Sequence, residues 1–240
     1  RVPAVIEILP YSSGLPRNIQ QCLRDYDIPL YLRHTVVNIE GLRRVKAVTI
    51  AEVDDSWKPV EGTEKVIECD TLLLSVGLIP ENDLSREASI ELDPKTGGPV
   101  VDEDLETSVE GVFACGNVLQ VHDIVDYVSR EAAGAGKSAA EYVLGKKKKD
   151  GREGMLRVEA GDGVRYVLPQ CISGEVDVRF SLRVNYPQRN RVIMVMGDDK
   201  VVKEIRKVRV NPAEMIQFTL SRDEMGDLKN SLVVGLLENG

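Results

Sequence analysis

The stretch TSVEGVFACGNVLQVHDIVDYVSREAAGAG, residues 107–136, decides the fold of this chain. A short apolar run at 112–114 leads into Cys115-Gly116-Asn117, and a helical pattern begins a few residues later. A strand that passes into a helix through a glycine turn is the arrangement by which α/β proteins present backbone amides to a cofactor. We therefore predict a buried strand at 112–114, a turn at Gly116 and a helix over 123–144.

Apolar and small residues recur along this predicted helix at the spacing of one buried face. Asp123 stands where it can cap the start of the helix, and Gly145 follows the end. The run AGAGKSAA at 133–140 resembles the end of a phosphate-binding loop, but Glu131 occupies the position of the first glycine that such a loop needs. The predicted stripe consists of Ile124, Tyr127, Val128, Ala132, Ala135, Ala139 and Val143.

The composition excludes several classes of protein. The chain has 240 residues and a net charge of -8, whereas binding to a nucleic-acid backbone requires clustered Lys and Arg. The longest apolar run, at 72–76, is far shorter than the roughly 18 residues of a membrane span. The four cysteines form no CxxC pair, so zinc spacing is absent and buried thiols in a reducing cytosol are expected. We predict a soluble, cytoplasmic protein that binds neither nucleic acid nor membrane.

The first 67 residues contain short β-like runs around one helical stretch. Strands are predicted at 5–9, 30–39 and 44–53, and the last two form a hairpin around Gly41. A helix is predicted to begin at Asn18 as its cap and to extend through Asp25. Its buried face consists of Ile19, Cys22 and Leu23.

The middle part, 68–145, contains the continuous apolar run CDTLLLSVGLIPEN at 69–82. Such a run predicts a strand at 72–76 that is buried on both faces, as in a sheet covered by helices. Four consecutive lysines and Asp150-Gly151 follow the long helix, so a linker is predicted at 146–154. Lysines at a helix C-terminus are favoured by the helix dipole and stay solvated.

The third part, 155–240, changes to β-branched, alternating runs that recur about every ten residues. This spacing is typical of an all-β, immunoglobulin-like sandwich, and Gly197-Asp198-Asp199 is predicted to be a hairpin turn. The part has no His and no acid pair at catalytic spacing, which favours an interaction or packing module. Strands are predicted at 164–168, 176–184, 192–196, 201–210, 215–220 and 232–237.

The opening stretch resembles the second FAD motif of the pyridine nucleotide-disulfide oxidoreductase superfamily, T-x(3)-G-[VI]-[FY]-A-x-G-D. This chain has Asn117 where most members have Asp, and Asn can still hydrogen-bond a ribityl hydroxyl. The resemblance implies that the amides at the start of the following helix face the flavin pyrimidine. The matching residues are Thr107, Gly111, Phe113, Ala114, Gly116 and Asn117.

The end of the apolar run at 69–82 resembles a second signature of the superfamily. The matching residues are Ser75-Val76-Gly77 and Pro80, and the Asn of the signature is displaced to position 82. In relatives it marks the return from the NAD(P)-binding domain to the FAD-binding domain, and Gly77 would let the backbone pass close to the cofactor. Residues 1–67 then resemble the latter half of the NAD(P) domain. Glu7, at the end of a strand there, is a candidate acceptor for the adenosine ribose hydroxyls.

The similarity to thioredoxin-reductase-like members also implies which residues meet the flavin. Their contacts precede an A-A-G stretch, and aligning it with Ala132-Ala133-Gly134 places Asp126, Tyr127 and Val128 at the flavin ring. The turn itself contributes Gly116, Asn117 and Val118. The implied organisation is α/β, with partial Rossmann-like domains at 1–67 for NAD(P) and 68–145 for FAD, then the linker and the β-sandwich at 155–240.

Several parts of the family pattern are absent from residues 1–240. Both G-x-G-x-x-G loops and any catalytic CxxC would precede Arg1, which opens directly on a β-like run without Met. We therefore expect a truncated, C-terminal portion of an FAD-dependent NAD(P)H oxidoreductase that binds FAD weakly or not at all by itself. In the intact enzyme, hydride would pass from nicotinamide to flavin and then to an unidentified acceptor, and no catalytic residue is assigned.

The residues suggest three other interpretations. His122 with Asp123 and Asp126 is too small a set for a metal site, because the only other histidine, His34, lies in a different predicted domain. The chain could instead be a non-catalytic scaffold whose β-sandwich docks a protein partner or a second copy. It could also be a natural subunit whose flavin site is completed by another chain.

Overall fold

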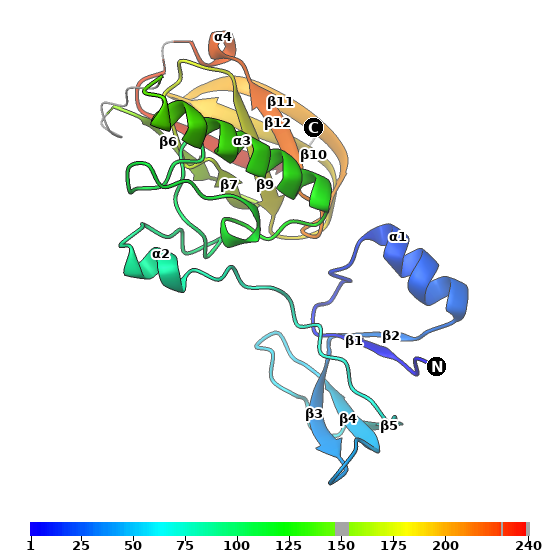
Figure 1. Ribbon diagram of the computed structural model, residues 1–240. Helices are drawn as coiled ribbons and strands as arrows, with labels where there is room; N and C mark the ends of the chain where they lie inside the picture. Colours follow the sequence, from blue (N-terminus) through cyan, green and yellow to red (C-terminus); the bar gives the residue numbers. More distant parts are fainter. Residues whose placement is uncertain (147–153, 227, 239–240) are drawn as a thin grey trace. The chain divides into compact units, whose positions relative to one another are not determined.

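The computed structural model describes residues 1–146, 154–226 and 228–238 of a mixed α/β protein (Figure 1). The chain divides into two compact units, Arg1–Gly77 and Leu78–Gly240. The predicted linker at 146–154 lies, from 147 to 153, outside the described residues. None of the helices in the described ranges has the length and apolarity that a membrane span requires.

The first unit has a parallel strand pair and a three-stranded antiparallel sheet. Strand β1 (Val5–Glu7) pairs with β2 (Leu30–Leu32), and a helical segment connects them through α1 (Pro16–Asn18), η1 (Ile19–Leu23) and η2 (Arg24–Tyr26). The second sheet has the order β3 (His34–Glu40), β4 (Ala47–Glu52) and β5 (Lys65–Glu68). Its central strand carries the buried residues Ala47, Val48, Ile50 and Ala51.

The β3–β4 hairpin is confirmed, but three details of the first unit were predicted wrongly. Arg33 adopts a positive φ of 54°, which divides the predicted strand 30–39 into β2 and β3. The helix begins at Pro16, whose fixed φ suits a first helical turn, and Asn18 does not cap it. Cys22 is exposed, so its predicted place on a buried face is also wrong.

The second unit combines helices with two antiparallel-rich sheets. Its helical elements are α2 (Asp83–Glu87), η3 (Gly116–Val118), α3 (Val125–Val143) and α4 (Arg222–Met225). The larger sheet has the order β11 (Lys200–Val210), β10 (Gln188–Gly197), β13 (Ser231–Glu238), β6 (Leu156–Ala160) and β8 (Cys171–Ile172). The smaller sheet has the order β12 (Ile216–Leu220), β9 (Val178–Val184) and β7 (Val164–Leu168).

These strands confirm the six predicted for the third part, and β6 and β8 were missed. The hairpin turn predicted at 197–199 is confirmed: Gly197 pairs with Lys200, and the two residues between them, Asp198 and Asp199, both have positive φ. Both sheets contribute to one hydrophobic core, in which the rings of Phe180 from β9 and Phe218 from β12 stack 5.1 Å apart.

A second cluster of buried residues joins the middle part of the chain to the β-rich part. Val101, Ala114 and Leu119 pack with Tyr166 and Leu168 of β7. Arg130 of α3 also donates to Gln217 of β12 over 3.4 Å, so α3 lies beside the smaller sheet. The long helix and the sheets therefore belong to one packed body.

Two predicted strands of the middle part do not form. Residues 72–76 have no strand partner among the described residues, and the exposed fractions of Leu73, Leu74 and Val76 are 85%, 74% and 92%. Residues 112–114 form only an isolated bridge between Phe113 and Glu106. A buried strand requires neighbouring strands, and in the described residues 72–76 has none, while 112–114 has only this single bridge. Ala114 is nevertheless buried, so the predicted burial of the second run is confirmed at that residue.

Candidate cofactor site

The motif turn is built around Gly116, the first residue of η3. Its φ of +71° is a backbone conformation that favours glycine, and it follows the extended Cys115. The Gly116 N–H donates to Glu131 Oε2 of α3 over 2.6 Å, and its carbonyl accepts from the N–H groups of Leu119 and Gln120. A Cβ at Gly116 would lie 3.5 Å from Val128 Cγ1. The turn is thus held directly against the first turns of α3.

The N-terminus of α3 lies at the molecular surface with its first turn exposed. The exposed fraction of Val125 is 73%, Asp126 is exposed as well, and Tyr127 and Val128 are half-buried. Ile124 is the N-cap residue and its side chain makes no capping hydrogen bond. The first N–H groups of a helix have no partner within the helix and carry its positive dipole end, so they suit an electron-rich ligand group.

Asp123 does not cap this helix, contrary to the prediction. It precedes the N-cap residue, and its carboxylate lies 3.2 Å from Arg183 Nη2 of β9 and accepts from the Met215 N–H over 3.3 Å. The exposed fractions of the Arg183 and Asp123 side chains are 11% and 13%, so this ion pair is largely shielded from water.

Asn117 is exposed at the centre of the turn. Its Oδ1 accepts from the backbone N–H of His122 over 3.2 Å, which braces the segment that enters α3. The side-chain amide nitrogen is then the group that Asn117 can offer to a ligand as a donor.

Glu131 is the centre of a polar cluster beneath the turn. In addition to Gly116, its carboxylate accepts from Gln120 Nε2 over 2.9 Å and lies 3.3 Å from His122 Nε2. The His122 side chain is only 2% exposed. Burial, and then the negative charge of Glu131, raise the pKa of the Cys115 thiol. Across the described residues, no group of three or more His, Cys, Asp or Glu could hold a metal ion.

Asn82 connects the second family signature to the motif turn. Its side chain is buried, and Nδ2 donates to Val118 O over 2.8 Å and to Gly97 O over 2.9 Å. Ser85 Oγ in turn donates to Asn82 Oδ1. The displaced Asn of the signature therefore fixes the end of η3.

The structure brings Gly116, Asn117 and Val118 together with the first turn of α3, where the other three predicted contacts lie. Gly77 and Glu7 belong to the first unit. Gly77 is exposed with a φ of +104°, and a Cβ there would meet nothing within 4 Å. The Glu7 carboxylate accepts from the Leu9 N–H and from the N–H and hydroxyl of Ser13.

Sequence reasoning missed the roles of Glu131, Gln120 and Arg183. Glu131 was considered only as the residue that rules out a phosphate loop. It lies fifteen residues after Gly116, about two turns into the predicted helix, and this position gave no local signal of a contact with the turn. Arg183 comes from the β-rich part, and no motif marks it.

The comparison with protein families matches residues 5–139, more than half of the chain, to the pyridine nucleotide-disulphide oxidoreductase family. The chain belongs to this family. A thioredoxin reductase of Treponema pallidum is 26% identical over 126 residues, covering 52% of this chain and 38% of the relative. A dihydrolipoyl dehydrogenase of Pseudomonas aeruginosa is 28% identical over 150 residues, covering 61% of this chain and 29% of the relative. The chain thus spans well under half of either relative.

A solved structure of a thioredoxin reductase from Giardia duodenalis aligns with 58% of this chain and 44% of its own, at 18% identity and a TM-score of 0.36. Proteins of this family use FAD and NAD(P)H. The uncapped first turn of α3, next to Gly116 and Asn117, fits the flavin end of such a cofactor.

Proposed function

We propose that the intact protein is an FAD-dependent oxidoreductase that takes hydride from NAD(P)H and passes electrons to a further acceptor. Membership of the pyridine nucleotide-disulphide oxidoreductase family supports the reaction class. The observation that supports a particular location for the FAD site is the N-terminus of α3, which is exposed, has no side-chain cap and lies against the Gly116 turn. When FAD is bound, its isoalloxazine ring supplies the redox chemistry.

The residues of this chain would bind and orient that ring. The first turn of α3, with Asp126, Tyr127 and Val128, would face the flavin pyrimidine, where the positive dipole end favours developing negative charge. The Asp126 N–H is the proposed donor, because the Tyr127 N–H donates to Ile124 O over 3.3 Å. Asn117 would donate from its amide to a ribityl hydroxyl. Glu131 acts through Gly116 by holding the turn in its left-handed conformation.

Glu7 is the proposed acceptor for the adenosine ribose hydroxyls of the pyridine nucleotide. The N–H groups of Leu9 and Ser13 already fix its carboxylate at the end of β1, and an ionised carboxylate has further lone pairs for a diol. A carboxylate in this place favours NADH over NADPH, because the 2′-phosphate of NADPH would repel it.

The immunoglobulin-like character of the two packed sheets and the division into four segments stay predictions.

The proposal is tested with the protein expressed from its complete coding sequence. We expect one bound FAD per chain by visible absorbance, and bleaching of that absorbance on anaerobic addition of NADH. Asn117→Ala is expected to weaken FAD binding, whereas Asn38→Ala, at an exposed position of β3, should not. Residues 1–240 alone are expected to bind FAD weakly or not at all.

A complete protein with neither flavin absorbance nor NAD(P)H oxidation would contradict the proposal and favour the scaffold alternative. Stoichiometric FAD on residues 1–240 alone would contradict the expectation that upstream contacts are needed. Flavin binding that appears only after mixing with a second purified polypeptide would identify a subunit completed by another chain.

A further inference from the structure

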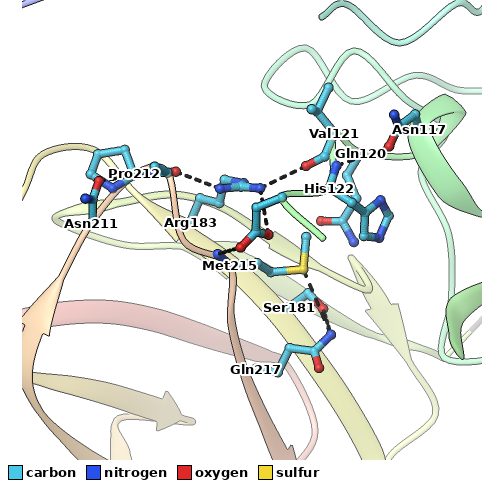
Figure 2. A network of polar contacts seen from close by, with 12 residues as sticks. Asn117, Gln120, Val121, His122, Ser181, Arg183, Asn211, Pro212, Met215 and Gln217 are labelled. Atoms are coloured by element: carbon cyan, nitrogen blue, oxygen red, sulfur yellow. Dashed lines mark hydrogen bonds and ion pairs between the residues drawn. The ribbon is translucent and has the colours of Figure 1, made fainter. Parts of the chain in front are cut away.

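Arg183 of β9 connects the β-rich part of the chain to the segment that enters α3 (Figure 2). Its Nη2 donates to Val121 O over 3.0 Å and lies 3.2 Å from Asp123 Oδ1, while Nη1 donates to Pro212 O over 2.7 Å. Its Nε donates to the hydroxyl of Tyr166, which is buried, over 3.1 Å. One guanidinium thus contacts four groups from three separate segments.

Two of these four acceptors lie immediately before the proposed flavin contacts on α3. Val121 and Asp123 precede Val125, the first residue of α3, by four and two residues. The segment is braced on its other side by the Asn117 contact to His122 and by Glu131. From the β-rich part, Arg183 and the Met215 N–H make polar contacts with this segment.

We propose that Arg183 is a positioning residue for the flavin site, so that the β-rich part completes this site instead of serving as a separate docking module. The inference rests on the proposed function. Arg183 does not touch the proposed flavin contacts itself. It fixes the position of the segment that precedes α3, and this segment determines the orientation of the first N–H groups of the helix. Displacement of such groups by a fraction of an ångström is enough to weaken ligand binding.

Arginine suits this position for a geometric reason. Its planar fork of five N–H donors can serve four acceptors at fixed angles, whereas a lysine ammonium is a single point with three donors. Lysine at 183 could therefore keep the ion pair with Asp123 but could not at the same time serve Val121, Pro212 and Tyr166. The lysine variant keeps a positive charge beside Asp123. Any effect of the substitution on FAD binding can therefore be assigned to the lost hydrogen bonds and not to an unpaired buried charge.

The experiment compares Arg183→Lys with Arg179→Lys in the protein expressed from its complete coding sequence. Arg179 lies on the same strand with its side chain exposed, so the control makes the same chemical change outside the network. FAD affinity, the visible circular dichroism of bound FAD, the melting temperature of the FAD-free form and hydrogen exchange at 119–127 are measured for both.

For Arg183→Lys we expect FAD affinity to fall about tenfold, the dichroism of saturated FAD to change, and exchange at 119–127 to rise about tenfold. Arg179→Lys should match the wild type. A lower melting temperature with unchanged affinity and dichroism would overturn the inference, because Arg183 would then be only structural. If Arg183→Lys does not fold, Asp123→Asn, which keeps an acceptor for Met215, is subjected to the same criteria.

A wild-type protein that binds no FAD would overturn the proposed function and this inference together. A wild type that binds FAD while Arg183→Lys binds it equally well would overturn this inference alone. The two failures are therefore distinguishable in one titration series.

Discussion

Glu131 determines the geometry of the motif turn although it lies outside the motif. Its carboxylate accepts from the N–H of Gly116 and from Gln120, and it lies against His122. Hydrogen bonds to a charged acceptor are stronger than neutral ones, and they gain further from the partly buried position of this carboxylate. A single side chain of α3 thus fixes both the turn and the segment that follows.

The same carboxylate contributes, after burial, to the raised pKa of the Cys115 thiol. Burial and the Glu131 charge raise the pKa of this thiol, and the thiolate is the form that reacts with alkylating agents. We expect Glu131→Gln to lower the pKa and to speed iodoacetamide labelling of Cys115 about threefold at about pH 8. The difference should shrink at higher pH, where the thiol ionises in both proteins.

Labelling is followed by mass spectrometry of the Cys115 peptide. Cys22 is exposed and lies in the first unit, so its labelling rate provides an internal control and should not change. An unchanged Cys115 rate in Glu131→Gln at about pH 8 would refute the assigned electrostatic effect.

Gly98 permits a close approach of backbone to the motif turn. A Cβ at this position would lie 1.9 Å from the carbonyl oxygen of Leu119, and backbone cannot move aside as a flexible side chain can. We expect Gly98→Ala to lower the free energy of unfolding of the second unit by about 2–3 kcal/mol in urea denaturation.

The control is Gly136→Ala in α3, where a Cβ would meet nothing within 4 Å. Alanine is the better helix former, so this variant should be stabilised by up to about 1 kcal/mol. Equal stability of the two variants would show that the Gly98 contact is not a constraint.

At the scale of elements, the β10–β11 ladder places like charges directly opposite one another. Arg191 pairs with Lys207 and Arg189 with Arg209, while Glu238 forms an ion pair with Arg191 over 2.8 Å. Like charges in opposite positions destabilise a sheet, and the cost is screened by salt. Because β11 is an edge strand of its sheet, such cations also oppose pairing with another chain.

Lys207→Glu is therefore expected to raise the free energy of unfolding by about 0.5–1 kcal/mol at low salt, and by less at high salt. Lys200→Glu makes the same change in net charge opposite Gly197, and it should leave stability nearly unchanged. Urea denaturation at two salt concentrations gives the comparison. A gain of the same size in both variants would point to net charge and not to the ladder.

Some elements could be predicted from the sequence and others could not. The β-rich strands were predictable because alternation and the Asp-Asp turn are local properties, and α3 was predictable from its length and its terminal Gly145. The runs at 72–76 and 112–114 failed, because apolarity shows what a strand could bury but not which strands are present to pair with it. The apolar stripe of α3 was also only partly correct, since Val143 is 81% exposed.

Over the whole second unit, the contacts that matter for the candidate site join residues far apart in the chain. The motif located Gly116, Asn117 and the first turn of α3, but the contacts of Asn82 to Val118 and of Arg183 to Val121 span 36 and 62 positions. No periodicity or spacing encodes such pairs, because they depend on how the sheets and the turn pack.

Leu119 tests whether the turn and the sheets form one cooperative body. It is fully buried in the cluster that joins Val101 and Ala114 to Tyr166 and Leu168 of β7. Leu119→Ala leaves a cavity there and should cost about 2–4 kcal/mol of unfolding free energy. Because the cluster is shared, hydrogen exchange should accelerate in β7 and β9 as well as in α3.

The control is Leu84→Ala, at an 82% exposed position of α2, which should change stability by less than about 0.5 kcal/mol. If only α3 lost protection while β7 kept its wild-type exchange rates, the turn and the sheets would be separate folding units, and the β-rich part could not hold the motif turn in place.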